Sequence, residues 1–161
     1  GNLASRTIAM TNRYFQGEIQ EPKNYTEADQ QIQSVAKLAV DGANAAIDKI
    51  AIHEAISKIW TLVDELNGYI TTQEPWVLAK DESNRERLGT VLYTASEGLR
   101  VLAVLLNPVM PKAAQKLWSA LASDLGSLET QDLNDAGSWG QLKPGQMMQE
   151  LEALFPRVEE Q

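Results

Sequence analysis

Apolar residues recur every three or four positions through most of the chain, and this spacing chiefly decides which folds are open to it. A period near 3.6 puts such residues on one side of a helix, and the alternating β-branched runs typical of strands are missing. The clearest stripe is Ile52, Ile56, Ile59, Val63, Leu66 and Ile70. It predicts a central core helix over about residues 52–72, and the spacing as a whole predicts an all-α protein.

The same period predicts four further helices. We expect them from about Asn2 to Gly17, Thr26 to Ile50, Ser83 to Pro108, and Pro111 to Ser123. Thr26 is a favourable N-cap residue, and Ser83 with Glu86 has the spacing of a capping box. Pro108 would end the fourth helix, since proline cannot continue one, and Pro111 suits the first turn of the fifth.

The C-terminal part of the chain has a different pattern. Residues 124–146 contain four glycines and a proline and predict an irregular segment, followed by a short helical piece near Met147 to Leu154. A length of 161 residues suits one domain. We therefore expect residues 1–161 to form a single helical bundle of about five helices, with the irregular segment draped over it.

Composition restricts the setting and the partners. The chain has no cysteine, which excludes disulfides and thiolate metal sites, and no continuous apolar run approaches the roughly 20 residues that span a bilayer. We expect a cytosolic protein without a membrane partner. The helical pattern starts directly after Gly1, which suggests a fragment of a longer protein. The net charge of -8, taken alone, argues against a nucleic-acid partner.

Sequence signatures of catalysis are weak. His53-Glu54 has half of the spacing of a zinc-protease motif, but it is the chain's one histidine, so we expect no metal site. Neither a nucleophile elbow, nor a Walker loop, nor a dinucleotide fingerprint occurs. The acidic residues are scattered over predicted solvated helix faces. We expect no catalytic residue in this chain.

The first predicted helix carries a polar face beside its apolar one. At about 100° per residue, Asn2, Arg6 and Arg13 fall within a narrow arc. An amide next to a guanidinium presents donors and acceptors in a fixed array, which is what reading the edge of an unpaired base requires. The alternative is an ordinary solvated helix face.

The four tryptophans have different predicted surroundings. Trp60 and Trp118 lie near apolar stripes and are expected to pack in or against the core, and Trp139 is expected to anchor the irregular segment. Trp76 follows Pro75 at the break after the third helix, where a ring can lie at the surface. There it could stack on a base, an interaction worth on the order of 1 to 3 kcal/mol. The alternative is a ring that plugs the end of the bundle.

Several stretches are more specific than any periodicity. They are Asn2-Leu3-Ala4-Ser5-Arg6, Asn12-Arg13-Tyr14-Phe15, the stretch from Pro75-Trp76 to Lys80, the stretch from Val101 to Pro111, and Leu154-Phe155-Pro156-Arg157. Together they resemble the methionyl-tRNA synthetase family, in which a helical-bundle domain that follows the catalytic domain binds the anticodon. The resemblance covers nearly the whole chain.

The resemblance implies roles for particular residues. In that family the asparagine and the arginine four residues later bond anticodon bases, and the tryptophan after proline stacks on the first base. By motif position these are Asn2, Arg6 and Trp76, the last preceded by Pro75. The arginine of Leu-Phe-Pro-Arg implies a further contact by Arg157, and Arg13 is carried over as well.

The resemblance also implies a parent reaction, in which ATP with Mg²⁺ activates methionine and the aminoacyl group passes to tRNA. This chain would hold no cofactor itself. Its partners would be the anticodon loop of tRNA(Met), read as CAU, and the parent's catalytic domain. An acidic chain can serve this role if the loop touches one end of the domain through few phosphates. Two rivals stay open: the anticodon domain of a valine, isoleucine, leucine or cysteine synthetase, and a helical protein-interaction module anchored by Trp76.

Overall fold

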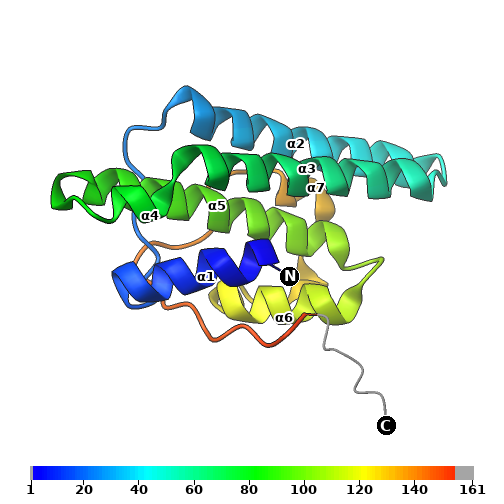
Figure 1. Ribbon diagram of the computed structural model, residues 1–161. Coiled ribbons are helices and arrows are strands. Elements are labelled where there is room, and N and C mark those ends of the chain that lie inside the picture. The colour runs from blue at the N-terminus through cyan, green and yellow to red at the C-terminus, as the bar shows by residue number, and fades with distance from the viewer. Residues whose placement is uncertain (1, 155–161) are drawn as a thin grey trace, which may run out of the picture.

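A computed structural model describes residues 2–154 of the chain, and these residues form an α-helical bundle (Figure 1). Within this described range no strand forms, and the one β-type pairing is an isolated antiparallel bridge between Glu18 and Met147. The all-α prediction is therefore confirmed.

The bundle contains five helices of eleven residues or more and two single-turn helices. In chain order they are α1 (Asn2–Phe15), α2 (Glu27–Asp48), α3 (Ile52–Gln73), α4 (Pro75–Leu78), α5 (Arg85–Leu106), α6 (Pro111–Leu121) and α7 (Leu133–Ala136). Short 3₁₀ turns occur at Glu82–Asn84, Ser123–Leu125 and Leu128–Thr130. The five long helices match the predicted ones to within a few residues at each end.

The centre of the bundle is α5. Figure 1 shows it between the α2–α3 hairpin on one side and α1 and α6 on the other. Every residue from Leu88 to Leu105 is buried, so the predicted central role of residues 52–72 is wrong. A clean stripe marks a helix with one buried face, as in α3, whereas α5 is enclosed on all sides and even its polar residues, Glu97 and Arg100 among them, are buried.

Helix starts were predicted with mixed success. The Thr26 N–H donates to the Asp29 carboxylate at 2.9 Å, which is half of a capping box at the start of α2. The predicted box of Ser83 and Glu86 is wrong, because Ser83 lies in a 3₁₀ turn before α5. Its N–H and hydroxyl both donate to Asp81, which is placed as an N-cap of that turn. The short-range bond to Asp81 thus takes the place of the capping box.

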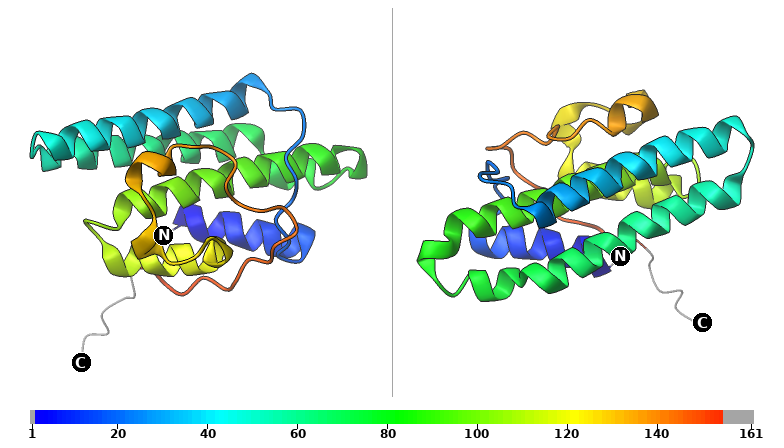
Figure 2. Two further views of the ribbon diagram at one scale, coloured as in Figure 1. Left: turned by 180° about the vertical axis from the view of Figure 1, so that it is seen from behind. Right: turned by 90° about the horizontal axis from the view of Figure 1, so that it is seen from above.

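The segment after α6 crosses one face of the bundle, as predicted (Figure 2). Residues 147–154 are not helical, which corrects the prediction of a short helix there. Their backbone is bonded to other parts of the chain instead: the Met148 N–H donates to the Gly17 carbonyl and the Gln149 N–H to the Ala120 carbonyl, each at 2.8 Å. These external partners satisfy backbone groups that a helix would pair internally.

A buried ion pair ties this segment to α5. Glu97 and Arg100 are fully buried, with Arg100 donating to Glu97 at 2.8 Å. The Glu97 carboxylate also accepts N–H bonds from residues 140, 141 and 142, and Arg100 donates to the carbonyls of residues 136 and 138. The pair therefore holds the irregular segment by its backbone.

The span Glu82–Leu106 is long and apolar enough, by length and composition, to cross a membrane. The expectation of no such segment rested on uninterrupted apolar runs, and Glu97 and Arg100 interrupt this one. All of the apolar window is buried inside the protein, as in the core helix of a bundle.

Candidate functional site

Two of the predicted site residues, Arg6 on α1 and Trp76 on α4, lie close to each other. A small apolar cluster joins these elements: Phe15 of α1 with Leu88 and Leu92 of α5, covered by Met10, Tyr14, Leu78 and Ala79. The cluster ties α1 and the α4 turn to one end of α5. Side chains on the outer faces of α1 and α4 are thereby held at a fixed separation.

The position of Trp76 is set by a sharp turn after α3. Glu74 adopts the left-handed conformation, with φ 48° and ψ 60°, and its N–H closes α3 on the Ile70 carbonyl at 3.1 Å. Its own carbonyl accepts from the N–H groups of Val77 and Leu78, which starts α4 at once. Pro75 is buried at the first position of α4, where the missing N–H leaves no helical bond unmade. Trp76 therefore projects from a well-held turn.

Arg6 and Trp76 meet across α1 and α4. The Arg6 Cζ lies 5.6 Å from the centroid of the Trp76 ring, within the range of a cation–π interaction. Arg6 is exposed, and Trp76 is half-buried with part of its surface packed against the main core. The guanidinium and the indole thus lie together at the surface, and the ring is not sealed inside the bundle.

Asn2 and Arg13 flank Arg6 on α1. Both side chains are exposed. At 1.5 Å per residue, Asn2 lies about 6 Å before Arg6 along the helix axis and Arg13 about 10 Å after it. The Arg13 Cζ is 5.7 Å from the ring of its neighbour Tyr14. We call Asn2, Arg6 and Trp76 the α1–α4 rim; Arg13 extends it along α1, and Arg157 lies outside the described residues.

Charge is unevenly distributed along the chain. Residues 1–17 include Arg6 and Arg13 and no aspartate or glutamate, although the whole chain has a net charge of -8. The α1 side of the rim is therefore locally basic, whereas on the α4 side Glu74 lies two residues before Trp76. An acidic total charge does not exclude an anionic partner at this helix, because charges farther away than about 10 Å are largely screened at physiological salt.

Sequence reasoning missed a residue that holds α1 in place. Arg85 donates from Nη2 to the Tyr14 carbonyl at 3.2 Å, and its Cζ lies 4.5 Å from the Phe15 ring centroid. It satisfies one of the carbonyls left free at the end of α1. The sequence contained a weak signal of this contact. An arginine in the first turn of a helix is electrostatically unfavourable, so its guanidinium is expected to interact with another part of the protein.

The other tryptophans differ from one another. Trp118 is buried and donates to the Gly126 carbonyl at 2.9 Å, and Trp139 donates to the Tyr25 hydroxyl at 3.2 Å, so both predicted packing roles are confirmed. Trp60 is 57% exposed, and its predicted role in packing is wrong. It follows the buried Ile59 on α3, and one step along a helix turns a side chain by about 100°, away from the core.

The described residues offer little for metal binding. Within residues 2–154 no group of three or more His, Cys, Asp or Glu side chains is placed to hold a metal ion. His53 is exposed in the first turn of α3.

Comparison with known proteins gives a consistent picture. Residues 19–161 match the family described as the anticodon binding domain of methionyl tRNA ligase. The methionine–tRNA ligases of Streptomyces coelicolor and Bacillus subtilis are 44% and 41% identical to this chain over 99% of its length. The chain spans 31% and 24% of these two relatives, respectively. The family match begins after α1, so it does not include Asn2, Arg6 or Arg13.

Solved structures agree with the sequence comparison. Methionyl-tRNA synthetase of Mycobacterium tuberculosis in its free state matches with a TM-score of 0.88 and 29% identity, over 100% of this chain and 32% of that one. The same enzyme in complex with methionyl-adenylate matches with a TM-score of 0.88 and 30% identity, over 98% of this chain and 30% of that one. With the family match over residues 19–161, these relatives show that the chain belongs to the anticodon-binding domain family of methionyl-tRNA ligases.

Proposed function

We propose that residues 1–161 are the anticodon-binding domain of a methionyl-tRNA ligase and that the α1–α4 rim holds unpaired bases of the CAU anticodon of tRNA(Met). The observation that carries this proposal is the Arg6 guanidinium placed 5.6 Å from the centroid of a half-exposed indole. Splayed-out bases are bound in proteins by stacking on such rings and by hydrogen bonds to their edges.

Each residue of the rim supplies a different interaction. Trp76 offers a flat apolar face on which one base can stack. Arg6 offers charged donors for base or phosphate oxygens, and the Asn2 amide both donates and accepts. Arg6 already lies near the ring in the free domain, so less side-chain entropy is lost when RNA binds. Arg13, farther along α1, would reach a neighbouring part of the loop, and we keep Arg157 as a further proposed contact.

The reaction itself would take place elsewhere in the ligase. We propose that the parent catalytic domain activates methionine with ATP and Mg²⁺ in the cytoplasm, and that this chain selects the tRNA. The matched family is that of the methionine enzyme, which favours it over the valine, isoleucine, leucine and cysteine rivals. Loss of anticodon binding should then lower tRNA methionylation without changing adenylate formation.

The test is binding of RNA stem-loops followed by tryptophan fluorescence. Because Trp60 is exposed and would contribute to the signal, the measurement uses the Trp60→Phe variant. A CAU loop should quench Trp76 more than a loop with a different triplet does. Trp76→Ala or Arg6→Ala should cost roughly 1 to 3 kcal/mol of binding, which is about 5- to 150-fold in Kd.

A matched control is Val77→Ala, which removes an exposed side chain next to Trp76. It should leave both CAU affinity and the thermal midpoint unchanged. Equal quenching by every triplet would reject the CAU proposal, and failure to bind any loop would favour the protein-interaction alternative. A large fall in the thermal midpoint for Trp76→Ala would identify the ring as a core residue instead.

A further inference from the structure

Trp76 follows a turn whose backbone is strained. Glu74, between α3 and α4, has φ 48° and ψ 60°, a left-handed conformation that residues other than glycine seldom adopt. Such a conformation persists only where the surrounding structure holds it in place, and it is found most often at functional sites. The helix that begins directly after this turn, α4, has only four residues. The direction of the Trp76 ring therefore depends on how the chain is held at the end of α3.

A network of polar side chains holds that end of α3. Gln73 is the last residue of α3, and its Oε1 accepts a hydrogen bond of 2.7 Å from Nη2 of Arg87, in the first turn of α5. Arg87 also donates to both carboxylate oxygens of Asp29 on α2, at 2.6 and 2.9 Å. The Asp29 side chain is fully buried and accepts a further bond from the Tyr69 hydroxyl, one helical turn before Gln73. We call Asp29, Tyr69, Gln73 and Arg87 the Arg87 network.

The geometry of an arginine suits this network. A guanidinium carries five N–H donors in a planar fork, so one side chain can bind a carboxylate through two of them and still donate to an amide oxygen. Because Arg87 binds the buried Asp29 carboxylate through two nitrogens, the plane of its guanidinium is fixed. Gln73 is thus bonded to a group that cannot rotate freely. The last turn of α3 is thereby joined to α2 and α5 one residue before the strained Glu74.

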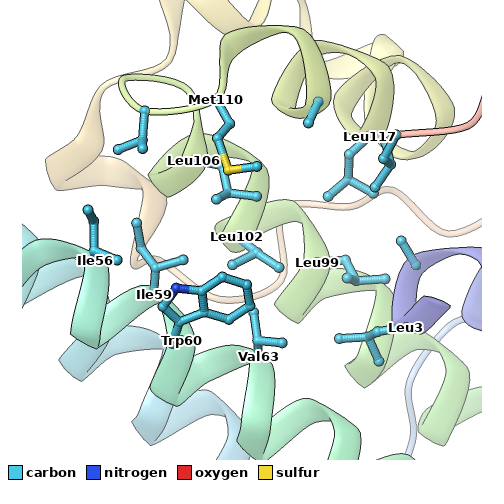
Figure 3. Close-up of a pocket in the computed structure, with 14 residues that line it drawn as sticks. Leu3, Ile56, Ile59, Trp60, Val63, Leu99, Leu102, Leu106, Met110 and Leu117 are labelled. Carbon is cyan, nitrogen blue, oxygen red and sulfur yellow. The ribbon is translucent and has the colours of Figure 1, made fainter. Parts of the chain in front are cut away.

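The α1 side of the rim is held by other contacts. Near the start of α1, Leu3 is buried and lines an apolar hollow between α1, α3, α5 and α6 (Figure 3). At its other end, α1 is bonded to Arg85, which lies two residues before Arg87 in the same turn of α5. The first turn of α5 therefore contacts the end of α1 and the end of α3. It relates the positions of the two sides of the rim to each other.

We infer that Arg87 and Gln73 are positioning residues of the anticodon site: their hydrogen bond sets the direction of the turn that carries Trp76, and so the separation between the indole and Arg6. This inference rests on the proposed function. Both residues act through Trp76 and need no contact with RNA. Without the bond, the strained turn relaxes and the ring samples other directions, so more freedom is lost when a base stacks on it.

The experiment uses the full-length ligase with the substitution Gln73→Met. Methionine keeps the length of the side chain and nearly the same helix propensity, but it offers no amide oxygen to Arg87. Replacing Arg87 would instead leave the buried Asp29 charge without its partner and destabilise the fold. The matched control is Gln31→Met, because Gln31 is exposed on α2 and lines the same groove between α2 and α3 as Gln73.

The kinetic readout is a double-mutant cycle with Trp76. We expect Gln73→Met to lower kcat/KM for tRNA methionylation about three- to tenfold, the range that corresponds to loss of one hydrogen bond, and to leave adenylate formation unchanged. In the Trp76→Ala background the same substitution should change kcat/KM by less than about twofold, because no ring is left to position. Gln31→Met should change kcat/KM in neither background.

Amide hydrogen exchange in the full-length ligase reports on the turn itself. The N–H groups of Val77 and Leu78 bond to the Glu74 carbonyl at 2.9 and 3.1 Å, so their exchange requires the turn to open. Gln73→Met should speed their exchange about three- to tenfold, and exchange along α1 should stay the same.

The outcomes separate this inference from the proposed function. A full loss from Gln73→Met in the Trp76→Ala background would overturn the inference, because Gln73 would then act by contacting RNA directly or by stabilising the whole fold. Unchanged kcat/KM or unchanged exchange in Gln73→Met would overturn it as well. A Trp76→Ala ligase with unimpaired methionylation would reject the proposed function, and this inference with it.

Discussion

Replacing Glu97 by glutamine tests the buried pair that joins α5 to the irregular segment. Oε1 of Glu97 accepts from Arg100 and from the N–H groups of Gly140 and Gln141, and Oε2 accepts from the N–H of Leu142. Glutamine keeps the shape and one acceptor oxygen. It removes the negative charge, and its amide group turns N–H donors toward the N–H of Leu142.

The magnitude follows from burial. Both charged groups are fully buried, and removing one partner of such a pair costs about 3–5 kcal/mol, since the other charge remains without compensation. The unpaired Leu142 N–H adds to this cost. At about 2–4 °C per kcal/mol for a chain of this size, the thermal midpoint should fall by about 6–20 °C.

The assay is chemical and thermal unfolding followed by circular dichroism, with Glu65→Gln on the exposed face of α3 as the control. Glu65→Gln should change stability by less than about 0.5 kcal/mol. Adding Arg100→Met to Glu97→Gln should restore part of the loss, because no uncompensated charge remains. A Glu97→Gln variant within about 1 kcal/mol of the parent, or strictly additive losses in the double variant, would refute this account of the pair.

Two further predictions concern the interior. Burial raises the pKa of Asp29, but hydrogen bonds from Arg87, Tyr69 and the Thr26 N–H outweigh burial and hold this pKa below its usual value. The Asp29 carboxylate therefore stabilises the fold at neutral pH. This stabilisation is lost as the pH falls below about 4 and the carboxylate becomes protonated. Asp29→Asn should cost roughly 1.5–3 kcal/mol in urea unfolding at pH 7; a difference from the parent that stays constant down to pH 3 would contradict this. An alanine Cβ at Gly98 would lie 2.6 Å from Leu66 Cδ2, whereas one at Gly68 meets no atom within 4 Å. Gly98→Ala should therefore lower the free energy of unfolding by about 1–3 kcal/mol, and Gly68→Ala should raise it by about 0.4–1 kcal/mol. A higher urea midpoint for Gly98→Ala than for Gly68→Ala would contradict the packing described.

Features set by local spacing were predictable from the sequence. The five long helices follow from the apolar period, and the Thr26 start of α2 from a residue type that favours N-caps. The meeting of Arg6 with Trp76 came from motif resemblance, because no local rule places residues seventy positions apart in contact.

Features that depend on tertiary surroundings were not predictable. The central position of α5 needs partners on every side, and a stripe reports only one side. The extended course of residues 147–154 depends on acceptors at Gly17 and Ala120, which are distant in sequence. Trp60 belongs to a helix with a clear core face, yet its exposure follows from being one position off that face. Aromatic residues near a stripe therefore need their helical angle checked before they are assigned to a core.

The acidic composition is compatible with the proposed RNA partner because charge is unevenly distributed along the chain. The α1 side of the rim carries Arg6 and Arg13 and no acidic residue, whereas on the α4 side Glu74 lies two residues before Trp76. With few phosphates contacted at the rim, affinity should fall only gently with salt. Stacking on Trp76 would strengthen binding of any loop, and hydrogen bonds from Asn2 and Arg6 to base edges would then select among loops.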